Sequence, residues 1–145
     1  MRAMITFRQL KIANKGVLVS INRLIPQLSS AAKKLSLRQL AQMVKDKNTI
    51  FVGVWDGKDM IGMGLTVFIF TPRGLRARME DVVIDKSRRG RGIGKQLTDH
   101  LIGIARARRA MWLEFTSRTD RKETNRFYQR LGFKKRDANV YRLAF

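Results

Sequence analysis

Hydrophobic and polar residues follow two different periods along this chain. Apolar and polar residues alternate in Met4–Leu10, and β-favouring residues dominate Thr49–Trp55, so both segments favour strands. In Lys15–Ile25, and again after Ser36, apolar residues return every three or four positions, which predicts two helices. We expect Pro26 to end the first helix and Ser36 to cap the second, whose apolar face holds Leu37, Leu40, Ala41 and Val44.

The Asp56-Gly57 pair is typical of a hairpin turn and predicts a second long strand over Met60–Thr71. A loop, Thr71–Gly74, follows it. The later patterns predict, in order, a strand (Ala77–Asp85), a helix (the stripe Ile93, Leu97, Leu101 and Ile104) and a strand (Met111–Thr116). A helix stopped by Gly132 (Asp120–Leu131) and two short strands (Phe133–Lys135 and Val140–Leu143) follow. The order β-α-α-β-β-β-α-β-α-β-β favours a single α+β (α/β) domain over residues 1–145, with a mixed central sheet flanked by helices.

Composition excludes several classes of protein. A chain of 145 residues with 44% hydrophobic residues has the size and the core of one folded domain. The absence of cysteine excludes disulfide scaffolds and thiol nucleophiles, and with a single histidine, His100, we expect no metal site. No apolar run has the length of a signal peptide or a membrane span. We therefore expect a cytoplasmic protein without membrane contact.

The charge is extreme for so short a chain. Lys and Arg number 31 against 11 Asp and Glu, which gives a formal net charge of +20 and a pI near 11.6. The excess is shared by both halves of the chain, so it belongs to a folded surface rather than to a tail. Such a field predicts an anionic partner and leaves the nature of that partner open.

A glycine-rich turn, Arg89-Gly90-Arg91-Gly92-Ile93-Gly94, lies between a predicted strand and a predicted helix. Backbone N–H groups at the start of a helix are unpaired, and glycines allow several of them to converge on a phosphate. The spacing of the glycines is neither that of a P-loop nor that of the dinucleotide fingerprint. The turn therefore predicts a different kind of phosphate site.

Two segments resemble the signatures of the GCN5-related N-acetyltransferase (GNAT) family. The turn matches the pattern R/Q-x-x-G-x-G/A, and Asn125–Phe133 resembles the second signature, which ends in aromatic-Tyr-x-x-x-Gly-Phe with Tyr128 as its tyrosine. The predicted order of elements also agrees with the acyl-CoA N-acyltransferase fold from end to end. The resemblance implies an acetyltransferase that moves acetyl from acetyl-CoA directly to a primary amine.

The resemblance also implies roles for particular residues. The coenzyme A pyrophosphate would bind the turn, and the pantetheine would pair with the preceding strand, which splays from its neighbour in this family. Tyr128 would protonate the leaving thiolate, and a backbone N–H near Val82 or Val83 would meet the oxyanion. The implied coenzyme-binding residues are Val82, Val83, Ile84, Arg89, Gly90, Arg91, Gly92, Ile93, Gly94 and Lys95.

The second signature departs from the family pattern at Arg121 and Thr124, where Asn and Ala are usual. Asn125 is the nearest substitute for the usual asparagine contact to pantetheine. The general base is open between two carboxylates. Glu80 stands where many relatives hold one, and Glu114 is the second candidate. Because neighbours on a strand face opposite sides, we expect that Glu80 and Asp81 do not both line the cleft.

The acceptor is also open. Amino acids, aminosugars and protein amines all fit a direct transfer. The alternative is a basic, nucleic-acid-associated module on the same scaffold, including one that acetylates an aminoacyl-tRNA or a DNA-associated protein, with non-specific contact to a polyanion as its basis. The sequence predicts either a monomer or a homodimer.

Overall fold

The computed structural model describes residues 4–145, which form two compact units. The first unit extends to Phe115, and the second is Thr116–Phe145. Each unit is described by itself.

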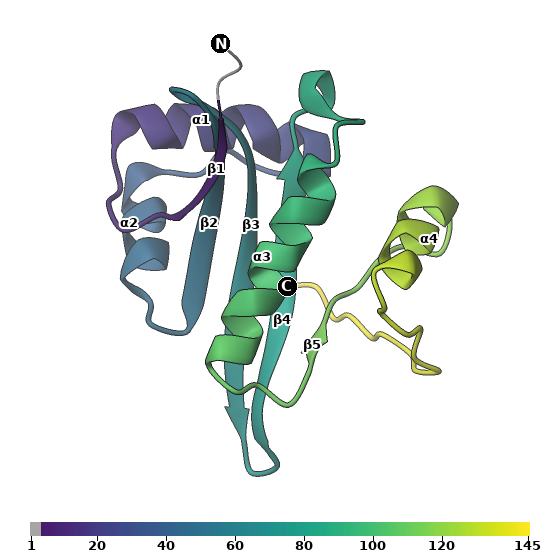
Figure 1. Cartoon of the computed structure of the whole chain (residues 1–145). Coiled ribbons are helices and arrows are strands. Elements are labelled where there is room, and N and C mark those ends of the chain that lie inside the picture. Colours follow the sequence, from purple (N-terminus) through teal and green to yellow (C-terminus); the bar gives the residue numbers. More distant parts are fainter. Residues whose placement is uncertain (1–3) are drawn as a thin grey trace. The chain divides into compact units, whose positions relative to one another are not determined.

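The first unit contains a five-stranded sheet in the order β1-β2-β3-β4-β5 (Figure 1). Neighbouring strands are antiparallel except β4 and β5, which are parallel, so the sheet is mixed as expected. The strands are β1 (Ile5–Gln9), β2 (Thr49–Asp56), β3 (Asp59–Thr71), β4 (Gly74–Ile84) and β5 (Leu113–Glu114). The expected hairpin between β2 and β3 is confirmed, and Gly57 takes a positive φ of 61° in its turn.

Helices cover both faces of this sheet (Figure 1). Helices α1 (Lys15–Leu28) and α2 (Leu37–Lys45) pack on one face, where Leu24 and Leu40 are fully buried among sheet residues such as Leu65. Helix α3 (Ile93–Ala107) packs against β3 and β4 from the other side, with Leu97 and Leu101 fully buried. The sheet is thus the middle layer of three.

The helix boundaries follow from local chemistry. Ser36 accepts from the Gln39 N–H, and the Gln39 side chain accepts from the Ser36 N–H, so the predicted cap is a complete capping box. The prediction that Pro26 ends the first helix is wrong, because α1 continues to Leu28. A proline in the last turn removes one N–H, but the Ser29 N–H still bonds to the Ile25 carbonyl and closes that turn.

The second unit contains α4 (Lys122–Arg130), after which Gly132 takes a φ of 99°. The prediction of two final strands, Phe133–Lys135 and Val140–Leu143, is wrong. An extended segment becomes a strand only when its backbone pairs with another strand, and the described residues offer these segments no such pairing. Their apolar side chains do not pack within the unit, since Val140 and Leu143 are exposed.

The mixed α+β class is confirmed, and only these last two elements of the predicted order are missing. The strand predicted over Met111–Thr116 is reduced to its two central residues. None of the helices in residues 4–145 combines the length and the apolar character that a membrane span requires.

The surroundings of two glycines in the first unit predict that substitution by alanine has opposite effects on stability at the two positions. A Cβ on Gly62 would lie 2.6 Å from the Ile84 side chain and 2.9 Å from the Val83 carbonyl oxygen. Because backbone does not yield easily, we expect Gly62→Ala to destabilise the protein by about 1–3 kcal/mol. Gly103 is an exposed residue of α3 with no described atom near such a Cβ. Gly103→Ala is therefore expected to stabilise by about 0.5–1 kcal/mol. Denaturant unfolding of both variants measures the two effects, and equal effects would contradict the packing at Gly62.

Candidate active site

Strand β4 has two neighbours at its start and one at its end. It pairs with β3 from Gly74 to Glu80 and again at Val83 and Ile84. Within the described chain, its pairing with β5 is confined to Ala77 and Arg78. The later residues of β4 therefore present a sheet edge on the β5 side, with backbone groups that can pair with an extended ligand.

A bulge interrupts β4 at the start of this edge. Leu65 of β3 pairs with Glu80, and Met63 pairs with Val83, so Gly64 alone opposes both Asp81 and Val82. Asp81 takes a φ of 49°, which a non-glycine residue rarely adopts. The extra residue means that the strict alternation of faces does not continue through Asp81 and Val82.

Both carboxylates considered as the general base contact the same arginine. The Arg78 Nε lies 3.1 Å from the Glu80 Oε1, and the Arg78 Nη1 lies 3.6 Å from the Glu114 Oε1. Arg78 and Glu114 are register partners of β4 and β5, so the pairing of the strands brings the charges together. Glu80 and Glu114 are therefore parts of one ion-pair cluster.

Asp81 differs from these two carboxylates electrostatically. Although the residue is exposed at the surface, the surrounding protein partly desolvates its carboxyl group, which raises its pKa, and the adjacent Glu80 charge raises it further. The structure gives no ion pair for Asp81 among the described residues. Desolvation and the neighbouring charge thus both favour the protonated form of Asp81.

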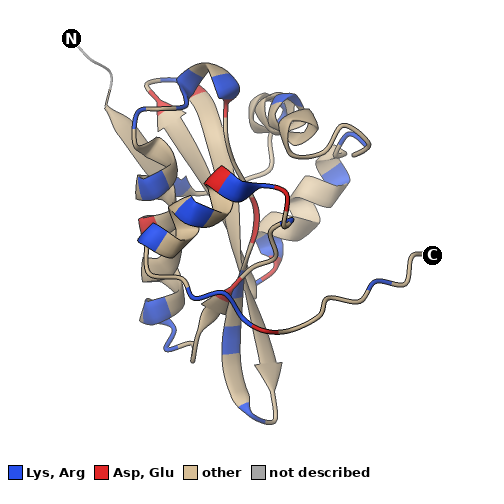
Figure 2. Ribbon diagram, turned by 90° about the vertical axis from the view of Figure 1, so that its right-hand side faces the viewer, with Lys and Arg blue, Asp and Glu red and all other residues tan. Residues whose placement is uncertain are grey.

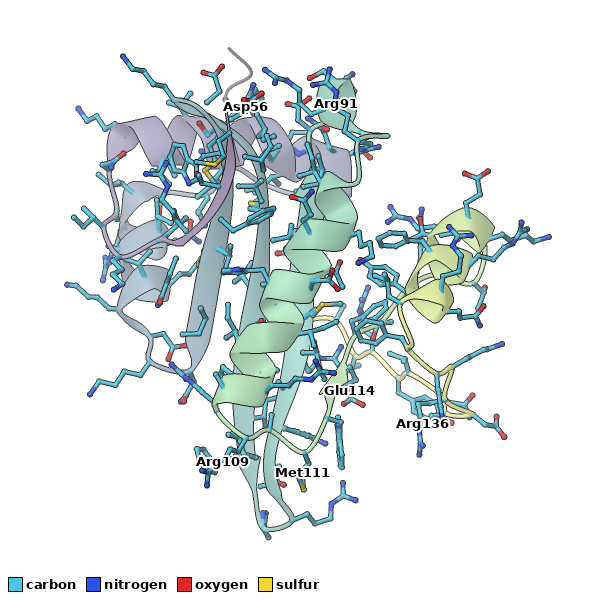
Figure 3. The ribbon with its side chains drawn as sticks, in the orientation of Figure 1. Asp56, Arg91, Arg109, Met111, Glu114 and Arg136 are labelled. Carbon is cyan, nitrogen blue, oxygen red and sulfur yellow. The ribbon has the colours of Figure 1, made fainter. Side chains whose placement is uncertain are left out.

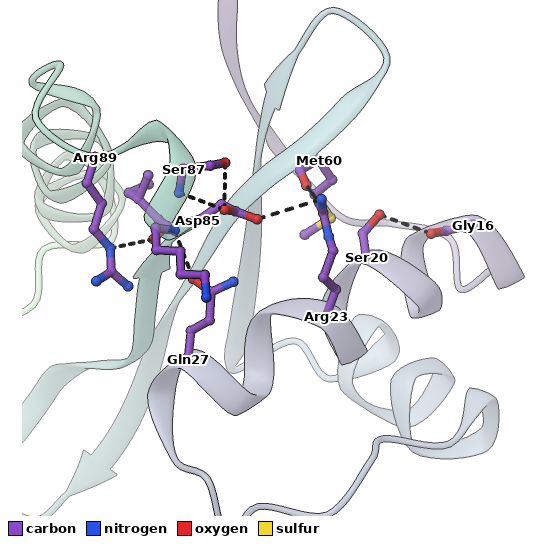
Figure 4. Close-up of polar contacts among 10 residues, drawn as sticks. Gly16, Ser20, Arg23, Gln27, Met60, Asp85, Ser87 and Arg89 are labelled. Carbon is purple, nitrogen blue, oxygen red and sulfur yellow. Dashed lines mark hydrogen bonds and ion pairs between the residues drawn. The ribbon is translucent and has the colours of Figure 1, made fainter.

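The chain after β4 is held by Asp85. This residue is only 7% exposed, and its Oδ1 accepts from the Ser87 N–H at 3.0 Å and from the Ser87 hydroxyl at 2.8 Å (Figure 4). Asp85 thereby caps the short 3-10 helix Lys86–Arg88. These two hydrogen bonds, and then the nearby Arg23 charge, lower the pKa of Asp85 against the opposing effect of burial.

Side chains of helix α1 also contact the chain around Asp85 (Figure 4). The Arg23 guanidinium lies 3.6 Å from the Asp85 carboxylate and donates to the Met60 carbonyl at 2.6 Å. The Gln27 side-chain oxygen accepts from the Lys86 N–H at 2.8 Å. These contacts join α1, β3 and the chain that leads into the glycine turn.

The glycine turn itself is open. Gly90 and Gly92 have φ angles of 79° and 75°, which explains why the turn needs glycine at both positions. The first bond of α3 runs from the Gln96 N–H to the Gly92 carbonyl, so the preceding N–H groups lie ahead of the helix ladder. No side chain of residues 4–145 caps this end, and a Cβ added at Gly90, Gly92 or Gly94 would meet no described atom within 4 Å.

The cations around the turn have different roles. Arg88 forms an ion pair with Asp56 at the β2–β3 hairpin, so its charge is already neutralised. The Arg89 Nε donates to the Ile84 carbonyl at 3.0 Å, and Lys95 pairs with Asp99 one helical turn later. Arg91 has no ion pair among the described residues and lies at the N-terminal end of α3, whereas Arg109 follows its C-terminal end (Figure 3).

Two expected site residues lie in the second unit, on α4. The Tyr128 ring contacts the Phe127 and Phe133 rings edge-on, at centroid distances of 5.1 and 5.8 Å. The Asn125 amide donates to the Arg118 carbonyl at 3.0 Å, which ties the start of α4 to the preceding loop. The remaining expected residues, Glu80, Val82–Ile84 and Arg89–Lys95, follow one another along β4 and the turn of the first unit.

Asp81 was not predicted as an irregular position, and Asp85, Arg23 and Asp56 were not predicted as anchors. The Asp85-x-Ser87 spacing is a known local capping signal and could have identified Asp85. The ion pairs of Arg23 and Arg88 join residues far apart in the chain and had no such signal. In residues 4–145, no three His, Asp or Glu side chains are grouped as a metal site would require.

This chain belongs to the GNAT acetyltransferase family, whose sequence pattern it matches over residues 21–133. No curated protein sequence matches it at a significant level.

Solved structures with the same fold are numerous. A transcriptional regulator from Bacillus halodurans is 25% identical, with a TM-score of 0.84 over 98% of this chain and 100% of the other. An acetyltransferase from Trypanosoma brucei is 26% identical, with a TM-score of 0.79 over 98% of this chain and 100% of the other. Glucosamine-6-phosphate N-acetyltransferase from Arabidopsis thaliana shares the fold at 15% identity, with a TM-score of 0.81 over 97% and 98% of the two chains.

The capping role of Asp85 predicts an acid-sensitive stability. We expect Asp85→Asn to lower the free energy of unfolding at pH 7 by about 1–3 kcal/mol, because a buried acceptor for two hydrogen bonds loses its charge. The lowered pKa means that this stabilisation is complete above the unfolded value of about 3.9 and disappears as the pH falls through the folded value. Unfolding curves at several pH values should therefore converge in acid. The exposed Asp137→Asn is the control, and an Asp85→Asn effect that persists unchanged in acid would contradict the assignment.

Proposed function

We propose that this protein is an acetyl-CoA-dependent N-acetyltransferase that transfers the acetyl group directly to a primary amine. The observation that carries the proposal is the glycine turn, where an uncapped helix start and two left-handed glycines leave backbone N–H groups open to an anion. Membership of the GNAT family supports the reaction class.

The first unit would hold the coenzyme through two adjacent features. The turn residues from Arg89 to Lys95 would bind the pyrophosphate through their N–H groups and the Arg91 charge. The edge of β4 at Val82, Val83 and Ile84 would pair with the amide groups of pantetheine, as an added strand would. Acetyl-CoA would supply the activated acetyl group as a thioester.

The chain's own groups would then stabilise the charges that develop during transfer. A backbone N–H at Val82 or Val83 would donate to the carbonyl oxygen as it becomes negative. Tyr128 would give its phenolic proton to the departing thiolate, a role that suits a group with an ordinary pKa near 10. Asn125 would contribute the pantetheine contact that Arg121 does not offer.

The surface charge bears on the acceptor. Lys and Arg lie on helices and loops throughout the chain rather than on one element (Figure 2). A field of this sign attracts acceptors that carry phosphate or carboxylate beside the amine and opposes the approach of polycations. An amino acid or an aminosugar phosphate fits this field better than a polyamine does.

Calorimetry with acetyl-CoA tests the coenzyme site. We expect binding by the wild-type protein and a loss of at least tenfold in affinity for Gly92→Ala, because the change strains a residue at φ 75° and displaces the start of α3. Gly94→Ala is the matched control. Gly94 is helical, a Cβ there meets no described atom, and the family pattern permits alanine. Absence of heat with the wild-type protein at millimolar acetyl-CoA would refute the coenzyme assignment.

Tyr128→Phe tests the acid. We expect turnover to fall about 10²–10⁴-fold while the affinity for acetyl-CoA changes less than twofold, because the phenol acts on the leaving group and not on the bound ground state. Thiol release during acetyl transfer measures turnover. Tyr141→Phe, on an exposed ring of the same unit, is the control. Unchanged turnover in Tyr128→Phe would remove this residue from the mechanism.

A further inference from the structure

We propose that Asp81, the extra residue of the β4 bulge, is the catalytic carboxylate that accepts the proton of the acceptor amine. This inference rests on the proposed function and changes the residue expected from the sequence, where Glu80 and Glu114 were the candidates.

The contacts of Arg78 argue against those two candidates. A carboxylate that serves as a base must offer an oxygen to the ammonium group of the acceptor. Glu80 and Glu114 instead share one guanidinium, at 3.1 and 3.6 Å. A guanidinium already held by these carboxylates competes with the acceptor ammonium group for the same oxygens. This cluster is therefore better suited to organise the β4–β5 edge than to take up a proton.

The bulge places a third carboxyl group between Glu80 and the edge of β4. Asp81 and Val82 together oppose Gly64, so Asp81 directly precedes the residues whose N–H groups are proposed to meet the oxyanion. Its φ of 49° costs free energy in any residue with a Cβ, and glycine would avoid that cost. An aspartate kept in such a conformation is the kind of backbone outlier that functional sites retain.

The surroundings of Asp81 favour proton uptake. The opposing segment of β3, Met63–Leu65, has no titratable side chain, and the Cβ position of Gly64 faces Leu97 and Leu101 of α3. The remaining ionisable groups of α3 and α1 are either exposed or have other contacts. Lys95 pairs with Asp99, His100 stacks on Phe7, Arg23 pairs with Asp85, and Lys15 and Arg106 are exposed. Glu80, Arg78 and Glu114 are the charges nearest in the sheet, and partial desolvation with the Glu80 charge raises the pKa of Asp81.

The proton balance of the step is simple. The ammonium group of the acceptor gives one proton to the Asp81 carboxylate, directly or through one water molecule, and becomes a neutral amine. The nitrogen lone pair then forms the C–N bond to the acetyl carbon, and the C–S bond breaks with its electron pair on sulfur. The thiolate takes the Tyr128 proton, and the nitrogen loses its second proton to the tyrosinate. Asp81 returns its proton to solvent, which restores the starting state.

Two substitutions at one position test the carboxyl group separately from the backbone. Asparagine and glycine both accept a positive φ, so Asp81→Asn and Asp81→Gly keep the bulge and remove the charge. We expect both to lower kcat about 10²–10⁴-fold and to bind acetyl-CoA within twofold of the wild type by calorimetry. Glu80→Gln and Glu114→Gln are the comparison variants, with losses below tenfold. The assay is thiol release from acetyl-CoA with a panel of amino acids, aminosugars including glucosamine 6-phosphate, and peptides with free N-termini.

The pH dependence of activity provides a second test, because it would not depend on Asp81 if this residue had only a structural role. In the wild type, kcat/KM should have an acid limb set by Asp81, and this limb should vanish in Asp81→Asn. Carbon-13 NMR of the aspartate carboxyl groups gives the same value without any acceptor. It should lie above the free value of about 3.9 and fall in Glu80→Gln, because a like charge is removed.

The outcomes separate the two proposals. If acetyl-CoA does not bind the wild type, the proposed function fails. If acetyl-CoA binds but Asp81→Asn keeps full turnover, or the Asp81 carboxyl titrates at or below the free value, the coenzyme assignment stands and the role of Asp81 is overturned. Loss of the folded state is not expected in Asp81→Asn, because a raised pKa means that the charged form opposes folding at neutral pH. Circular dichroism checks this point.

Discussion

The pairing of β4 changes along its length, and the candidate active site depends on this change. Over Ala77 and Arg78 the strand has neighbours on both sides, and beyond them only β3 remains. The bulge at Asp81 lies just past the last β5 contact and adds one residue against Gly64. A strand bonded to both neighbours throughout would have no free backbone for a ligand, and an unbulged strand would follow the strict alternation of its faces. The free edge of β4, the position of the Asp81 carboxyl group and the path of the chain into the glycine turn thus all follow from the way β4 is paired.

The glycine turn needs rigid supports because its three glycines supply none. Gly90, Gly92 and Gly94 carry no side chain that could pack, and their conformational freedom favours many arrangements of the loop. The supports lie on either side. Asp85 caps the chain before the turn, Arg23 and Gln27 hold it from α1, and Asp56 pairs with Arg88 from the β2–β3 hairpin. Preorganisation of this kind reduces the ordering cost that an anion would otherwise meet on binding.

The sequence predicted most of the fold, because periodicity and turn chemistry are local. The N-cap at Ser36, the Asp56-Gly57 hairpin and the strand-turn-helix around Gly92 all depend on neighbouring residues and were predicted. Features that depend on other strands were missed. The bulge at Asp81 requires knowledge of what opposes it, and the apolar alternation of Val140–Leu143 does not make a strand without a pairing partner. For the candidate site, the motifs predicted the turn and the strand before it, whereas the Arg78 cluster arises only when β4 and β5 pair.

The acidic residues of this chain are few, and several of them lie beside the proposed anion site despite the net charge of +20. Asp56, Asp85 and Asp99 each pair with a cation beside the turn, namely Arg88, Arg23 and Lys95. These ion pairs position the cations and lower the repulsion between them. Arg91 has no such carboxylate among residues 4–145 and stays available to an incoming phosphate. The surplus charge over the rest of the surface has a longer range, so it acts on the approach of anionic ligands, whereas Arg91 and the N–H groups of the turn would act on a ligand only at short range.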